Sequence, residues 1–503
     1  MSRVATTKWN LFFFYLRTII GFANGVLIVP LYLKYIDNTL FGLWLASGNI
    51  LTWITIIDPG VGDVLIQKVS AAYSKKNKKL LEYLLSSAVI VSSIVTIVAF
   101  LLSFSLSFFI KDILKLSDNA PIDELIFAYN INAIATCVTL FSFCLSGAIL
   151  GFQRTKEVGI ILTITGLLGI VLNVFLLLNN FGLSSIAYSS LFKSLSSSLI
   201  YSIFLIGLLK NQRIGFKLNL RYFRSFIKLF TYTFFSKFFG TIASNIDLVI
   251  ISRYLGPNAV TILELTRRPL RVIQSFVNIP SQSLLPAFSN LYAEGNKEKI
   301  RELIKRFVTV FSFTLFLMIS GFIIFNKELI TIWVGPSFYI GDLNNILLCI
   351  SVLTATFSYN LSNFTYSMGN IKGNSKIETF KSIFYIILLM LLVKTIGITG
   401  ALLGVLISSL STETWYYPFI ILKKVKLEFQ DLKAIKSTLI VGLLISFVLI
   451  ILFYFYNVDS WYFIGIKGVL FMALYALLFY SFDISFKSEF QKGKNLIFNK
   501  IFK

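Results

Sequence analysis

The feature that most constrains this chain is a weak internal repeat with a spacing of 219 residues. The pairs Tyr73/Tyr292, Asn77/Asn296 and Lys78/Lys297 share this spacing, as do Tyr35/Tyr254, Leu65/Leu284, Ser70/Ser289 and Leu84/Leu303. Both copies lie in strongly apolar sequence. Helical bundles repeated in the same sense along a membrane chain are typical of two lobes around an axis normal to the bilayer, with a substrate path between them. The repeat therefore predicts transporter architecture.

Composition places the chain in a membrane. Of its 503 residues, 56% are hydrophobic and 14% charged, and the mean hydropathy is +0.80. These values exclude a soluble core with an ordinary polar surface. The net charge of +23 resides in short loops between apolar segments, so it indicates membrane topology and not nucleic-acid binding.

Segments of ~20 apolar residues are long enough to cross a bilayer, and they predict an all-α polytopic membrane protein with about 14 transmembrane helices. We expect two six-helix repeats and two further helices at the carboxyl end. The predicted domains are an N-terminal lobe at 1–215, a C-terminal lobe at 216–430, and the two extra helices with a tail at 431–503.

Lysine and arginine concentrate in alternate connections between the spans, and basic loops remain on the cytoplasmic side. We therefore expect both termini in the cytoplasm. The basic connection from Lys210 to Lys228 joins the repeats. Its alternating apolar residues suit either a helix on the anionic inner leaflet or an ordinary positive-inside linker.

The densest intramembrane charge lies in the eighth predicted span. Glu264, Arg267, Arg268 and Arg271 fall on a helical arc of about 100°, with Pro269 among them. Three arginines and one acid leave positive charge for a phosphate or carboxylate that accepts forked hydrogen bonds. We interpret the arginines as substrate-binding residues. The alternative is that Glu264 pairs with Arg268 while the other arginines extend toward the membrane surface.

Other polar residues inside spans are secondary candidates. Arg17 lies ~12 Å into the first span and is a further candidate anion contact. Asn24 and Asn130 are candidate sugar contacts, although such amides also join helices. Asp247 and Glu413 are candidates for a coupling proton or sodium ion, or for ion pairs with Lys237 or Lys193.

Missing motifs and residue types limit the reactions that we expect of this chain. The sequence has no Walker-type lysine loop and no histidine, which removes ATP hydrolysis, the usual metal ligand and the commonest general base. We predict no catalytic residues, no metal and no cofactor, apart from H⁺ or Na⁺ as a candidate coupling ion. The protein is not predicted to be an enzyme.

Two regions carry a family resemblance. IVPLYLKYIDNTLFGLW at 28–44 and DPGVGDVLIQKVS at 58–70 resemble the first repeat of Wzx-type polysaccharide flippases, in the multidrug/oligosaccharidyl-lipid/polysaccharide exporter superfamily. GNIKGNSK and GITGALLGVLISS, within 369–409, resemble their second lobe.

The resemblance implies twelve core helices plus two, and movement of undecaprenyl-diphosphate-linked oligosaccharide from the inner to the outer leaflet of the bacterial cytoplasmic membrane by alternating access. The implied partners are this substrate, membrane lipids and the polysaccharide polymerase machinery, as in O-antigen biosynthesis. Arg17 and the three arginines fit the cationic cavity common in such proteins. A lipid II flippase remains an alternative. A cation antiporter should have an acidic pocket, whereas the dense intramembrane cluster of this chain is basic. A glycan polymerase typically has a large outer loop with catalytic residues, and the sequence predicts no such loop.

Overall fold

The chain folds into helices, as the sequence predicts. The computed structural model describes residues 3–58, 61–116, 122–217, 238–295, 297–425, 427–456 and 458–491, and no strand occurs within these ranges. The chain divides into two compact units, the N-terminal unit Met1–Thr261 and the C-terminal unit Ile262–Lys503. The predicted basic connection falls largely on 218–237, outside the described residues.

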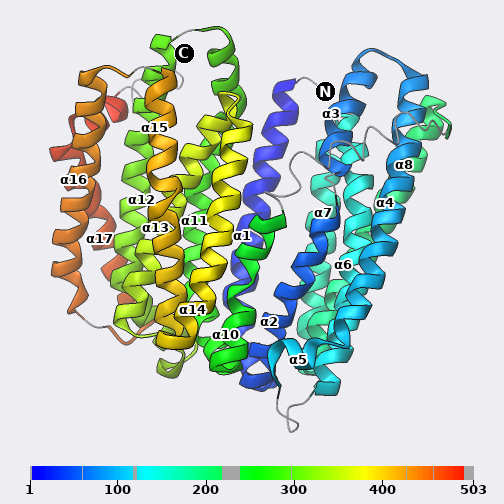
Figure 1. The fold of residues 1–503 in the computed structure, drawn as a ribbon, viewed down its shortest axis with the longest axis horizontal. Helices are drawn as coiled ribbons and strands as arrows, with labels where there is room; N and C mark the ends of the chain where they lie inside the picture. Colours follow the sequence, from blue (N-terminus) through cyan, green and yellow to red (C-terminus); the bar gives the residue numbers. More distant parts are fainter. Residues whose placement is uncertain are drawn as a thin grey trace. The chain divides into compact units, whose positions relative to one another are not determined.

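Within its described residues, the N-terminal unit contains nine α-helices, which Figure 1 labels. They are α1 (Arg3–Tyr35), α2 (Asn38–Ile54), α3 (Val61–Ser74), α4 (Lys78–Ser107), α5 (Ile110–Leu114), α6 (Ile122–Gly151), α7 (Thr155–Leu178), α8 (Ser184–Gln212) and α10 (Asp247–Leu255). A short 3-10 turn, Thr55–Ile57, follows α2.

The C-terminal unit takes in most of α11 (Pro257–Ala293) and the helices after it. These are α12 (Lys297–Trp333), α13 (Asp342–Ser367), α14 (Ile371–Ser411), α15 (Glu413–Val425), α16 (Phe429–Tyr454) and α17 (Trp461–Phe482), with a 3-10 turn at Pro336–Phe338. Non-helical backbone at Ile396 and Gly397 divides α14.

Within the described ranges, 11 helices are long and apolar enough to cross a membrane, or up to 12 if the bent pair Phe238–Asn245 and Asp247–Leu255 forms one span. The chain is therefore a multi-pass membrane protein, while the number 14 is not confirmed. Two features explain the difference. The helix α11 is not among the counted spans, and 371–425 is counted once although it contains the break at Gly397.

The ends of the helices follow the sequence repeat. The starts of α2 and α11, Asn38 and Pro257, are 219 residues apart, and so are the starts of α4 and α12, Lys78 and Lys297. The first copy is interrupted where the second is continuous. Asp58 lies in the interruption, whereas α11 has Val277 at the equivalent position.

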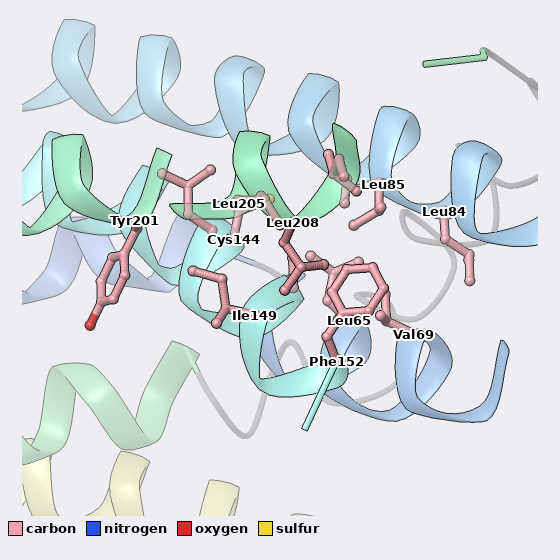
Figure 2. Close-up of a cluster of buried hydrophobic side chains, with 14 of the residues drawn as sticks. Leu65, Val69, Leu84, Leu85, Cys144, Ile149, Phe152, Tyr201, Leu205 and Leu208 are labelled. Atoms are coloured by element: carbon pink, nitrogen blue, oxygen red, sulfur yellow. The ribbon is translucent and has the colours of Figure 1, made fainter. Parts of the chain in front are cut away.

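The core of the N-terminal unit is apolar and includes two buried cysteines. One cluster joins α3, α4, α6 and α8 through Leu65, Leu84, Ile149 and Leu208 (Figure 2). Cys144 lies in this cluster, and Cys137 lies in the neighbouring one. Arg253 of α10 donates to the carbonyls of Asp112 and Ile113, so the last helix of the unit caps α5.

In the C-terminal unit, the last two helices pack on α12 around a buried ion pair. Lys467 Nζ of α17 lies 2.7 Å from Glu328 Oε1 of α12, and the two side chains are 3% and 6% exposed. Glu328 also accepts from the Val458 amide, and Lys467 donates to the Tyr456 carbonyl. These contacts tie the connection between α16 and α17 to α12.

Candidate functional site

A cavity of about 550 Å³ lies within the N-terminal unit, between α1, α6, α7 and α8. Arg17 of α1 and Lys193 of α8 lie in its wall. The remaining polar lining consists mostly of hydroxyl groups: Thr136, Thr139, Ser142, Ser146, Thr155, Ser190, Ser194, Ser197 and Tyr201, with the amide of Asn132. The cavity therefore combines two cations with many hydrogen-bonding groups.

A second cavity, of about 370 Å³, adjoins the first. Its polar lining includes Asn24 and Tyr32 of α1 and Asn173 of α7. Four residues line both cavities, namely Arg17, Leu162, Ser190 and Lys193. The two cationic side chains therefore lie at the boundary between the two spaces.

Neither of these cations forms an ion pair with a carboxylate in the described part of the chain. Arg17 Nε donates to the Phe13 carbonyl at 3.2 Å, a bond within its own helix, and both side chains are exposed to the cavity space. Lys193 lies nine residues into α8, or ~14 Å from its start. Charge this deep in a span is costly to insert and usually marks a polar pathway.

Glycines on α7 bring the walls together. Any side chain at Gly159 would collide with the Phe13 ring, so Gly159 permits α1 to approach α7 closely. A Cβ at Gly169 would meet the Lys193 side chain of α8 at an ordinary van der Waals distance of 3.4 Å. On the opposite wall, Thr139 and Ser194 share a hydrogen bond of 2.9 Å between α6 and α8. Small and hydroxyl residues at helix contacts are typical of packing in membranes.

The predicted sugar contacts occupy different environments. Asn24 lines the smaller cavity, and its Oδ1 has no hydrogen-bond partner. Asn173 donates to the Tyr32 hydroxyl from α7 to α1, and its Oδ1 has no partner among the described residues. Asn130 lines neither of the two cavities, whereas Asn132, one half-turn further along α6, lines the larger one.

The predicted arginine cluster on α11 is organised by its acid. Arg267 Nε and Arg271 Nη1 each lie 2.6 Å from a different oxygen of Glu264. Glu264 is 5% exposed, Arg267 12% and Arg271 52%. Arg268, the partner considered for Glu264 in the alternative interpretation, is partly buried on the same helix. Glu264 therefore offsets one of the three positive charges, and the four side chains keep a formal net charge of 3 − 1 = +2.

The two other acidic candidates have local partners. Glu413 Oε1 lies 2.5 Å from Lys381 Nζ of α14 and accepts from the Ser409 hydroxyl. Its partner is thus Lys381 and not Lys193; Lys237, the other partner considered from the sequence, lies outside the described residues. Asp247 Oδ1 accepts from the Leu248 amide at the start of α10.

Lys193 is the residue that the sequence interpretation undervalued. The sequence analysis treats Lys193 only as a candidate ion-pair partner of Asp247 or Glu413. The composition of its span could have identified Lys193 as a candidate cavity residue. The span has no acidic residue, and it has serines at 184, 185, 189, 190, 194, 196, 197 and 198. A lysine among hydroxyls on a membrane helix indicates a polar cavity.

The helices define a multi-pass membrane protein, and its fold is similar to the folds of solved membrane transporters. The chain is similar to a lipid II flippase, MurJ, in an inward closed conformation, with a TM-score of 0.71, 16% identity, and coverage of 94% of this chain and 98% of that chain. It is also similar to an inward-facing multidrug resistance MATE transporter, with a TM-score of 0.61, 13% identity, and coverage of 79% and 99%.

A MOP superfamily transporter from Pyrococcus furiosus is similar too, with a TM-score of 0.57, 15% identity, and coverage of 84% and 96%. Residues 9–292 match the family described as polysaccharide biosynthesis protein, and the chain belongs to this family. No curated protein sequence matches the chain.

Proposed function

We propose that this protein moves undecaprenyl-diphosphate-linked oligosaccharide repeat units from the inner to the outer leaflet of the bacterial cytoplasmic membrane, by alternating access. The observation that carries the proposal is the cavity inside a membrane-spanning unit, with Arg17 and Lys193 among hydroxyl groups. Membership of the polysaccharide biosynthesis family supports it.

The chemistry of the cargo matches the cavity. A diphosphate and a glycan cannot enter hydrocarbon without losing their hydration, whereas a prenyl tail can remain in lipid. Cations balance the diphosphate, and hydroxyl and amide groups replace water around the sugars. In this proposal Arg17, Arg268 and Arg271 contact the diphosphate during transport, Arg267 holds Glu264 in place, and Asn24 contacts sugar.

The orientation and energy source belong to the same proposal. Both termini lie in the cytoplasm, on the side of the basic loops. An ion gradient or the membrane potential drives transport, since the sequence has no Walker-type loop. The polymerase machinery takes up the translocated units at the outer leaflet.

A deletion and complementation experiment tests the proposal. Loss of the gene is expected to abolish surface glycan and to leave lipid-linked oligosaccharide in the inner leaflet, and the wild-type gene is expected to restore export. Normal surface glycan after deletion would refute the proposal.

A lipid II flippase is the second candidate, because the described fold matches the lipid II flippase MurJ over 94% of the chain. Both cargoes carry a diphosphate on a prenyl chain, so the cation-lined cavity suits both. Depletion of the protein in cells distinguishes the two candidate functions. Accumulation of a peptidoglycan precursor, with lysis, would favour this candidate, whereas accumulation of a polysaccharide repeat unit in intact cells favours the first.

A further inference from the structure

We propose that the segment leaving the last helix of each repeat acts as a strap, which fastens that helix to a pair of consecutive helices in the same repeat. The first strap is 212–217, at the end of α8, and it is held by α3 and α4. The second consists of Lys424 at the end of α15 with Glu428 and Asp431 at the start of α16, and it is held by α11 and α12. The straps act on the motion of each unit, whichever cargo the protein carries.

The first strap begins where α8 ends. Gln212 Nε2 lies 3.5 Å from the hydroxyl oxygen of Tyr73 on α3. Arg213 has a left-handed backbone, with φ 54°, which ends the helix. Ile214 is buried in the apolar cluster that joins α3, α4, α6 and α8. The chain therefore leaves α8 along the surface of α3 and α4, with one apolar side chain as its anchor.

Two backbone amides then bind the strap to α4. The amide of Gly215 donates to Glu82 Oε1 at 3.0 Å, and the amide of Lys217 donates to Ser86 Oγ at 2.9 Å. Ser86 donates its own hydroxyl hydrogen to the Glu82 carbonyl, so its oxygen is free to accept. Glu82 and Ser86 are four residues apart and lie on one face of the helix. Together they form a docking site for an extended piece of backbone.

The second strap is held by ion pairs. Arg301 of α12 pairs with Glu428, and Lys305 Nζ lies 2.7 Å from Asp431 Oδ1. Glu428 and Asp431 also form the capping box at the start of α16. The contacts on α12 thus fix the first turn of α16 directly after α15.

The positions that hold the straps are the same in both repeats. Lys424 Nζ lies 5.9 Å from the centre of the Tyr292 ring of α11, just as Gln212 lies against Tyr73 of α3. The holding residues form three pairs at the 219-residue spacing of the internal repeat: Tyr73 and Tyr292, Glu82 and Arg301, and Ser86 and Lys305. Because both copies bind the segment that leaves their last helix at equivalent positions, we assign the strap to the repeat unit itself.

The charge of the docking site is reversed between the copies. The first site offers a carboxylate at Glu82, and Lys217 Nζ lies 3.6 Å from it. The second site offers Arg301 and Lys305. Docking on the wrong site would place Lys217 beside two cations, or the acidic residues of the second strap beside a carboxylate. Like charges in contact oppose such pairing, so the reversal directs each strap to its own repeat.

The first strap ties a wall of the larger cavity to helices outside it. Lys193 and Ser194 of α8 line this cavity, and no described residue of α3 or α4 does. A closed strap makes α8 move together with these two helices. Rocking of one bundle against another requires each bundle to keep its shape. In this part, which rests on the proposed function, the straps stay closed throughout transport.

Hydrogen exchange at single amides of the full-length protein in nanodiscs, measured by mass spectrometry with electron-transfer fragmentation, tests the first strap. Glu82→Ala is expected to speed exchange at Gly215, and Ser86→Ala at Lys217, by about 10-fold each, since each removes a hydrogen-bond acceptor. Glu82→Gln keeps a carbonyl oxygen and is expected to retain most of the protection.

Glu124→Ala is the matched control. Glu124 also accepts a backbone amide in the N-terminal unit, that of Leu183 at 2.9 Å. This variant is expected to speed exchange at Leu183 and to leave Gly215 and Lys217 unchanged. Unchanged exchange at both strap amides in a folded Glu82→Ala/Ser86→Ala variant would overturn the first strap.

Charge reversal tests the second strap. Arg301→Glu is expected to speed exchange at Leu432, whose amide donates to the Glu428 carbonyl in the first turn of α16. The variant Arg301→Glu/Glu428→Arg restores opposite charges and is expected to restore the protection. Exchange that remains fast in this double variant would overturn the role assigned to charge.

A covalent strap tests whether the strap stays closed. Oxidation of the Ser86→Cys/Lys217→Cys variant is expected to join α4 to the strap and to leave glycan export unchanged. Export that stops on oxidation and returns on reduction would show that the strap opens during transport, which would overturn the lock. Normal surface glycan after deletion of the gene would refute the proposed function, whereas the exchange measurements would still decide whether the straps exist.

Discussion

The ion pairs of Glu264 predict that the clustered arginines differ in their structural roles. Arg267 and Glu264 are 12% and 5% exposed, and their atoms lie 2.6 Å apart. Removing one partner of a buried pair costs about 3–5 kcal/mol, because the other charge is left buried. We expect Arg267→Ala to cost roughly 3 kcal/mol, the lower end, since Arg271 still donates to Glu264.

Arg271 should behave differently. Its side chain is 52% exposed, so water screens its pair with Glu264, and Arg271→Ala is expected to cost less than about 1 kcal/mol. Unfolding by SDS in mixed micelles, followed by tryptophan fluorescence, measures both changes. Addition of Glu264→Gln to Arg267→Ala removes the stranded charge and is expected to restore most of the lost stability.

Equal losses for the two single variants would refute this reasoning, and so would a double variant no more stable than Arg267→Ala.

The stability result also decides how export data for the arginine variants are interpreted. We expect Arg268→Ala and Arg271→Ala to accumulate normally and to reduce export, with lysine replacements retaining more activity than alanine. Normal surface glycan in a well-expressed triple alanine variant at 267, 268 and 271 would remove the cluster from the binding site.

Three further predictions concern a buried ion pair, the break in α14 and the membrane topology. Lys467→Met should destabilise the protein by about 3–5 kcal/mol because it strands Glu328, and adding Glu328→Gln should recover part of the loss; a melting curve unchanged by Lys467→Met would contradict this. Gly397 has φ 65° and ψ −142°, so Gly397→Ala should cost about 1–3 kcal/mol in the same assay, and a neutral effect would show that the break in α14 relaxes. A cysteine introduced at Lys75 should react only with reagents that enter the cytoplasm, and one at Asp459 with impermeant reagents outside; the reverse pattern would invert the proposed topology.

The sequence by itself determined the class of the protein and the positions of its helices. Apolar segments of bilayer length fixed an all-α membrane fold, because only internally satisfied backbone is stable in lipid. Residues paired by the repeat occupy equivalent places in the fold, since Lys78 begins α4 and Lys297 begins α12.

Only the tertiary structure decided which charges have partners. Arg267, Arg268 and Arg271 point in similar directions along one helix, so periodicity could not choose between them, whereas packing placed two of them on Glu264. The partner of Glu413 depended on how α14 and α15 pack. Arg17 and Lys193 lie on helices that both pack against α7, where Gly159 permits the close approach of α1. Their shared cavity is a property of this packing, because contacts between distant segments leave no periodic signal in the sequence.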